Sequence, residues 1–209
     1  PNFAGSLGFY GEKGTFTNRG TIEASGKIAH AVVAKNSDMT FNHYGTIEVS
    51  SPSDNRGNIA VYSDGFSKVN FYNNSKVYVG DYSVGVHSAN KDKFNDTFKN
   101  LGTLGIKIGS KSTFAYLDGN ATTTLKEFFN LGNAKVNIVA PMGTESSLVY
   151  ANNEANLYRW SPVPNKGVDN LQVISNIVGT QNDLYNFPME DAVKWLNFEI
   201  SKIYGQNER

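Results

Sequence analysis

The sequence predicts an all-β fold in which short parallel strands wind into a β-helix, a solenoid of stacked turns. Three observations support this fold class. A Phe-x-Asn-x-Gly element recurs along the chain, segments that alternate apolar and polar residues follow each copy, and no helical periodicity interrupts residues 5–150. The composition agrees, because Gly accounts for 20 of the 209 residues and β-branched and aromatic residues are abundant.

The repeated element begins at Phe residues spaced 25, 30, 27 and 30 positions apart. Asn follows Phe by two positions and Gly by four, and the departures are His43 and Ser75. Stacking the turns at about 4.8 Å would place Phe in an internal aromatic column and Asn in a ladder of side-chain amides at a turn. Gly would occupy a tight bend, where a Cβ would clash or φ must be positive. The predicted ladder consists of Phe16, Phe41, Phe71, Phe98, Phe128, Asn18, Asn73, Asn100 and Asn130.

Each copy of the element is followed by two further strand-like segments, such as Thr46-Ile47-Glu48-Val49 and Ile59-Ala60-Val61-Tyr62. Each unit therefore holds about three short strands, which is typical of one turn of a solenoid. A β-sandwich is the alternative for the Phe residues, but its strands are usually antiparallel and need not repeat in register.

The repeat fades after Tyr150, so we expect a β-helix segment over residues 1–160 and a C-terminal extension over residues 161–209. Apolar residues Val193, Leu196 and Ile200 recur at helical spacing in the extension and predict an amphipathic helix over residues 187–204. Three interpretations of this helix remain open: an end cap over the coil, a small subdomain, or a partner-binding face. The cap is favoured because an open coil end exposes strand edges.

Charge and composition exclude several classes of function. Lys+Arg and Asp+Glu are both 19, which gives no electrostatic reason to expect nucleic acid or an anionic membrane as partner. The absence of cysteine excludes cysteine redox chemistry and Cys-based zinc sites. No apolar run is long enough for a transmembrane helix. The first residues lack a signal-peptide pattern, so we expect a processed piece of a longer protein.

No catalytic, metal-binding or cofactor motif is present, and we predict that the chain is not an enzyme. His30, His43 and His87 are isolated in sequence and are interpreted as structural or surface residues. Glu23 and Glu48 would occupy the same outward position in adjacent turns, about 5 Å apart, a separation that suits a retaining glycosidase. Stacked Glu residues on a solvated face are far commoner. We expect their column to continue as Tyr78, Lys107 and Asn137.

The recurring Asn-x-Gly-Thr-Ile, found at residues 18–22 and more loosely at residues 100–104, resembles the passenger region of type V (Va) autotransporters. Within that family it is most similar to the large fusobacterial RadD-like outer-membrane adhesins, over about residues 5–150. The resemblance implies a right-handed β-helix passenger, exported to the bacterial cell surface or outer membrane. It also implies a signal peptide and a membrane β-barrel translocator outside this chain. Passengers of the family are typically adhesins, and fewer are toxins, proteases or esterases.

Binding is therefore the expected role, with a host or bacterial surface receptor (protein or glycan) as partner. Variable insertions at residues 50–58, 88–96 and 118–126 are candidate binding loops, because per-repeat insertions of a solenoid project on one side. Exposed aromatic residues suit both sugar stacking and protein contact, although Tyr can equally fill edges of the coil. The alternatives to an adhesin are a receptor-binding or oligomerisation domain of a toxin and a polysaccharide-degrading enzyme. Candidate binding residues are Tyr62, Tyr78, Tyr82, Tyr116 and Trp160.

Overall fold

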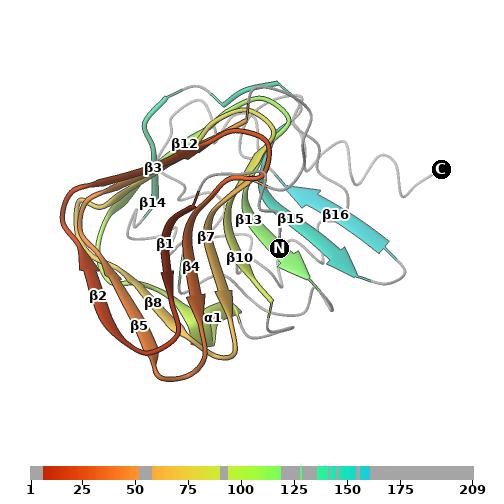
Figure 1. Cartoon of the computed structure of the whole chain (residues 1–209). Coiled ribbons are helices and arrows are strands. Elements are labelled where there is room, and N and C mark those ends of the chain that lie inside the picture. The colour runs from red at the N-terminus through yellow and green to blue at the C-terminus, as the bar shows by residue number, and fades with distance from the viewer. Residues whose placement is uncertain are drawn as a thin grey trace.

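The fold is a parallel β-solenoid, as the repeat predicts. The computed structural model describes residues 7–51, 58–89, 94–118, 128, 136–140, 142–144, 146–153 and 156–160. Its strands form three sheets around a common interior (Figure 1). Helix α1 (Phe94–Thr97) is short, and no helix among the described residues is long and apolar enough to cross a membrane.

Most repeat units contribute one strand to each sheet. Sheet A contains, in spatial order, β1 (Leu7–Gly11), β4 (His30–Lys35), β7 (Asn58–Asp64), β10 (Ser83–Ser88), β13 (Thr113–Asp118), β15 (Ser147–Asn153) and β16 (Asn156–Trp160). Sheet B contains β2 (Gly14–Asn18), β5 (Met39–His43), β8 (Lys68–Phe71) and β11 (Phe98–Asn100). Sheet C contains β3 (Thr21–Ser25), β6 (Thr46–Ser50), β9 (Lys76–Val79), β12 (Leu104–Ile108) and β14 (Val136–Ile138).

Pairing between strands is parallel except at the end of sheet A. Strand β16 turns back and pairs antiparallel with β15, with Tyr150 opposite Arg159. A hairpin thus follows the last parallel strand of sheet A, a change of direction that the repeat does not predict. The C-terminal extension, including the predicted helix at residues 187–204 and its proposed roles, lies outside the described residues.

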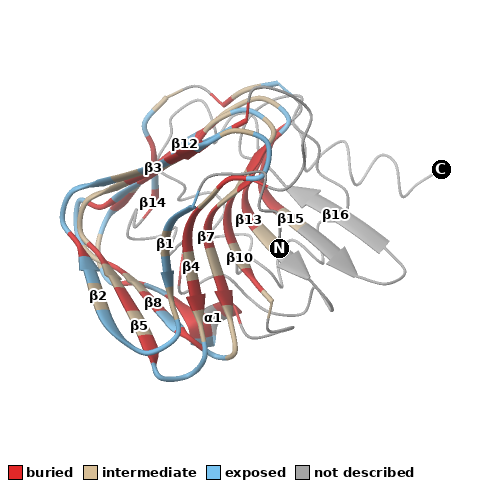
Figure 2. Ribbon diagram, in the orientation of Figure 1, coloured by how far each residue is buried: buried red, intermediate tan, exposed pale blue. Residues whose placement is uncertain are grey.

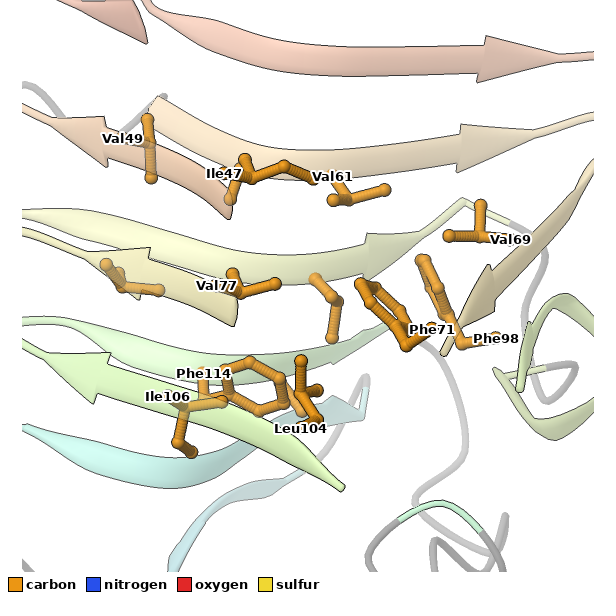
Figure 3. Close-up of a cluster of buried hydrophobic side chains, with 14 of the residues drawn as sticks. Ile47, Val49, Val61, Val69, Phe71, Val77, Phe98, Leu104, Ile106 and Phe114 are labelled. Carbon is orange, nitrogen blue, oxygen red and sulfur yellow. The ribbon is translucent and has the colours of Figure 1, made fainter. Parts of the chain in front are cut away.

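The interior is apolar and is filled by inward-facing residues of all three sheets (Figure 2). Ile47, Val77 and Ile106 lie one above another on sheet C (Figure 3). Phe16 and Phe41 are register partners on sheet B, with ring centroids 5.6 Å apart. Period-two alternation causes this burial, because every second side chain of a strand faces the interior.

The predicted Phe column is continuous only at its start. Phe41 is opposite Val69, and Phe98 is also opposite Val69, so Phe71 lies two residues out of the predicted alignment. Phe71 instead pairs with His43 and Asn100, which places it in the predicted Asn column. Since two residues are one period of a strand, its side chain still faces the interior and is fully buried.

The shift arises at the corner between sheets B and C. Four residues separate β8 from β9, whereas two separate β5 from β6, so the third unit has a longer corner. Asn73 consequently lies in this corner rather than in the ladder, where its Oδ1 accepts a hydrogen bond from the Thr103 backbone N–H at 3.0 Å. Asn74 follows with φ of 65°. The corner absorbs the extra residues, and sheet C regains the predicted register at Lys76, opposite Thr46.

The last copy of the element differs further. Phe128 is buried, with its ring 5.8 Å from that of Phe71 and 5.4 Å from that of Phe94. Its carbonyl accepts a hydrogen bond from the Asn100 side-chain amide at 2.9 Å. Phe128 is therefore a core residue, as predicted, but it is not part of a described strand of sheet B. Asn130 lies outside the described residues.

The glycine of the repeat is required by close approach between turns. A Cβ on Gly45 would lie 2.0 Å from the backbone oxygen of Gly20, and one on Gly102 would lie 2.5 Å from Cα of Asn73. Gly20 occupies the same position in the first described turn, where the nearest atom to an added Cβ is 4.0 Å away. Of the two predicted reasons for Gly, the clash applies here and a positive φ does not.

We predict that Gly45→Ala destabilises the fold by about 3 kcal/mol or more, because the clashing atoms are backbone and cannot move without disturbing strand pairing. Gly20→Ala is the matched control and should cost less than about 1 kcal/mol. Urea denaturation followed by circular dichroism measures both. An equal decrease in the free energy of unfolding for the two variants would show that the turns do not approach each other as described.

Candidate functional site

Two columns of outward-facing side chains run across sheet A and together form what we name the outer face of sheet A. Register partners define each column. The aromatic column contains Tyr10, Val33, Tyr62, His87, Tyr116 and Tyr150. The aliphatic column contains Leu7, His30, Ile59, Val84, Thr113 and Ser147.

The two columns lie on either side of a bend in the strands. In β7, Ala60 and Val61 are both fully buried, while Ile59 and Tyr62 on either side of them are half-buried. Two consecutive inward residues break the alternation, so the strand bends there. Figure 1 shows the strands of sheet A curving toward the interior of the coil. The outward rings of His30 and Tyr62 approach each other across this bend, with centroids 6.4 Å apart.

The rings of the aromatic column contact one another from turn to turn. Tyr62 and His87 meet edge to face at 5.4 Å, and His87 and Tyr116 do so at 4.8 Å. Tyr116 then stacks on Tyr150 at 5.3 Å with an angle of 17° between the ring planes. Such pairs contribute about 0.5–1.5 kcal/mol each beyond the area they bury. The result is a fixed array of rings on rigid strands.

From β1 to β15, the two columns of the outer face of sheet A contain no Lys, Arg, Asp or Glu. Arg159 of β16, as the register partner of Tyr150, ends the aromatic column, and the Tyr10 hydroxyl at its other end donates to the Glu12 carboxylate at 2.6 Å. Burial lowers the pKa of His30, so its imidazole is neutral at physiological pH. Burial, and to a smaller extent the Asp64 carboxylate, raises the pKa of the Tyr62 hydroxyl, which therefore stays protonated as a donor. Lys35 and Asp64, register partners at the next outward position, form a charged border.

The predicted binding aromatics separate into two groups. Tyr62 and Tyr116 belong to the aromatic column. Tyr78 lies on sheet C with the Lys107 ammonium 4.3 Å from its ring centroid, and Tyr82 lies at the next corner with Lys111 at 5.4 Å. These two rings are thus engaged by lysines of the chain itself. Trp160 ends β16, opposite Val149.

The predicted binding loops fall largely outside the described residues, which omit residues 52–57, 90–93 and 119–127. Among the described residues, Leu7 and Tyr10 of β1 are exposed large hydrophobic residues on sheet A, whereas Ile28, Phe66, Leu101 and Val139 are exposed outside the strands.

Glu23 and Glu48 are register partners, as predicted, and Tyr78 and Lys107 continue their column. Asn137 does not, because it pairs with Gly105 and is two residues out of the predicted alignment. Glu23 is exposed and Glu48 is half-buried on the outward side of sheet C. The next side chains in the column are a phenol and an ammonium, so the column supplies only two adjacent carboxylates.

His43 is a structural residue in the ladder, as predicted. Its side chain is fully buried, and its Nε2 donates to the Lys76 carbonyl at 2.9 Å. Nδ1 then accepts from the Asn18 side-chain amide at 3.3 Å. Burial lowers the pKa of His43 to about 4, and the hydrogen bond to the Lys76 carbonyl opposes this shift. The imidazole is therefore neutral in the folded protein.

His30 and His87 lie two turns apart in β4 and β10, with β7 between them. They also belong to different columns. Across the described part of the chain, no group of three His, Cys, Asp or Glu residues is arranged to hold a metal ion.

Sequence reasoning missed several members of the outer face of sheet A. His87 and Tyr150 are not among the predicted binding residues, although Tyr150 aligns with Tyr116 directly and His87 aligns with Tyr62 once β10 is shifted by one position. A second array was also missed. At the corner between sheets B and C, the Arg19 guanidinium lies 4.2 Å from the Tyr44 ring centroid, and Tyr44 stacks on Tyr72 at 4.2 Å.

Comparison with known proteins adds no assignment. No protein-family model, no curated protein and no solved structure matches this chain.

We predict that His43 makes the stability of the fold depend on pH. Its pKa falls from about 6.5 when unfolded to about 4 when folded, so the contribution is full above pH 6.5 and is lost as the pH falls toward 4. His43→Asn restores the residue type of Asn18 and Asn100. Between pH 7 and pH 4, the free energy of unfolding of the wild type should therefore fall by roughly 3 kcal/mol more than that of this variant.

Urea denaturation at each pH measures the effect. His30→Asn is the control. Because His30 is only half-buried, its replacement should change the pH dependence of the free energy of unfolding less than the replacement of His43 does. Parallel stability curves for wild type and His43→Asn would contradict the assignment of a neutral, buried imidazole.

Proposed function

We propose that this chain is a cell-surface adhesin module, in which the solenoid acts as a stiff scaffold that presents a binding surface to a host or bacterial receptor. The outer face of sheet A carries the proposal. Tyr is among the residue types that contribute most to binding energy at protein interfaces, and binding residues gain from a rigid support. The resemblance of the Asn-x-Gly-Thr-Ile element to autotransporter passengers favours the same function and a location at the bacterial surface.

The described residues favour binding over catalysis. A glycosidase would need Glu23 and Glu48 to hold different protonation states, which enzymes achieve by giving the two carboxyl groups different environments. Here the two residues repeat one outward position in neighbouring strands, and neither side chain is buried, since Glu23 is exposed and Glu48 is half-buried. The outer face of sheet A, by contrast, joins several turns into one continuous surface, which is the geometry that recognition of a large partner requires.

Binding of the purified chain to panels of host epithelial cells and bacteria tests the proposal. We expect saturable binding, weakened about tenfold or more by Val84→Lys, because a charge placed in the aliphatic column must be desolvated on contact. Glu48→Lys is the matched control, since it places the same side chain at a half-buried outward position of sheet C. Flow cytometry measures both, and circular dichroism checks the fold.

The absence of saturable binding to any cell type, together with release of reducing ends from a polysaccharide, would overturn the adhesin proposal. Loss of that release in Glu48→Gln would then assign the activity to the carboxylates of sheet C.

A further inference from the structure

The corner between sheets B and C holds two tyrosine rings in direct contact. Tyr44 follows β5 and Tyr72 follows β8, and their rings stack with centroids 4.2 Å apart and 7° between the ring planes. At this distance, carbon atoms of the two rings are in van der Waals contact. The backbone fixes both residues in the ladder of turns. The N–H of Tyr44 donates to the Asn18 carbonyl at 2.9 Å, and the N–H of Tyr72 donates to the His43 carbonyl at the same distance.

The two phenols also point in the same direction. The Tyr72 hydroxyl is hydrogen-bonded to the Tyr44 hydroxyl, which requires the two oxygen atoms to lie side by side. Burial, and to a smaller extent the neighbouring Tyr44 phenol, raises the pKa of Tyr72, so both this hydrogen bond and the neutral phenol persist at physiological pH. Because the rings are nearly parallel as well, the carbons next to each hydroxyl face their counterparts across the stack. These ortho carbons are the positions at which phenoxyl radicals couple.

The neighbours of the pair do not compete for such coupling. Toward the preceding turn, the Arg19 guanidinium lies 4.2 Å from the Tyr44 ring centroid and supports the ring in the stack. Toward the following turn, the equivalent position is Leu101, whose N–H donates to the Phe71 carbonyl at 2.7 Å. Neither a guanidinium nor an aliphatic side chain forms a phenoxyl radical, so Tyr44 and Tyr72 can couple only with each other along this column.

We propose that Tyr44 and Tyr72 form a site of covalent modification, at which a haem peroxidase with hydrogen peroxide joins the two rings as dityrosine. Each phenol loses one electron and one proton, and the peroxide takes up both electrons and both protons to give two water molecules. The two phenoxyl radicals form a carbon–carbon bond between ortho carbons. The hydrogen on each bonded carbon then moves to the oxygen of its own ring and restores the phenol.

The cross-link has a structural consequence. It ties two successive turns together at the corner between sheets B and C, beside the longer corner of the third unit. Both side chains are half-buried rather than enclosed, which leaves the ring edges open to an oxidant at the surface. This inference goes beyond the proposed function and does not rest on it, because the pair lies on a different part of the solenoid from the outer face of sheet A.

Treatment of the dilute purified chain with a haem peroxidase and hydrogen peroxide tests the site. We expect the blue fluorescence of dityrosine. Mass spectrometry of the digested protein should find the peptides of Tyr44 and Tyr72 joined, with the loss of two hydrogen atoms. Tyr44→Phe and Tyr72→Phe should each abolish the joined peptides, because Phe keeps the stacking ring but forms no phenoxyl radical. Tyr116→Phe is the matched control, since Tyr116 stacks on Tyr150 at 5.3 Å and its replacement should leave the joined peptides unchanged.

The cross-link should also stabilise the fold, because joining two turns reduces the conformational freedom of the unfolded chain, as a disulfide does. We expect a higher urea midpoint for oxidised wild type than for oxidised Tyr72→Phe, measured by circular dichroism beside the untreated proteins. The inference is overturned if no dityrosine forms, if other tyrosines couple while Tyr44 and Tyr72 stay unmodified, or if coupling occurs only between molecules. An unchanged midpoint for the joined protein also overturns it, since the link would then not hold the turns together.

Discussion

Parallel pairing between equivalent strands of successive turns is the constraint on which the rest of this structure depends. It fixes neighbouring turns at one strand spacing, about 4.8 Å, so every side chain meets the residue in the same column above and below it. Gly45 follows from this spacing, because its Cα approaches the Gly20 carbonyl too closely for a side chain. The stacked rings of Phe16 and Phe41 inside, and of Tyr116 and Tyr150 outside, follow from it equally.

The corners between sheets accommodate extra residues, which the strands cannot. Strands tolerate no extra residue without a change of register, whereas a corner can lengthen if its backbone groups find other partners. Side chains provide many of those partners. Asn58 is buried and donates to the carbonyls of Gly26 and Ser50, while its Oδ1 accepts from the Ala29 N–H. The Ser112 hydroxyl similarly donates to the Gly80 carbonyl at 2.6 Å. The short polar residues of the chain thus close the turns.

The same constraint explains why the outward positions of sheet A differ from those of sheet B. Inward positions must be apolar to fill the coil, but outward positions are free to vary from turn to turn. On sheet B they are mostly Thr, Asn and Lys, and Asn70 hydrogen-bonds Asn42 in the next turn. On sheet A they are aromatic and aliphatic, and the bend at Ala60 and Val61 brings the two columns toward each other. The ring contacts stabilise neighbouring turns, and the apolar surface beside them supports the binding role that we propose.

The sequence by itself determined the fold class, the positions of most strands and the side of each strand that faces the core. These features depend on alternation and repetition, which are local and survive any change in corner length. Only the tertiary structure decided which residues share a column. The longer corner before Lys76 moved Phe71 into the Asn column, and Asn137 came to lie opposite Gly105. His87 joined Tyr62 and Tyr116 through a separate shift of one position in β10. A two-residue shift leaves the inward and outward sides unchanged, so the alternation of the sequence carries no signal of it. The antiparallel turn of β16 is also a tertiary result, because strand pattern alone does not specify direction.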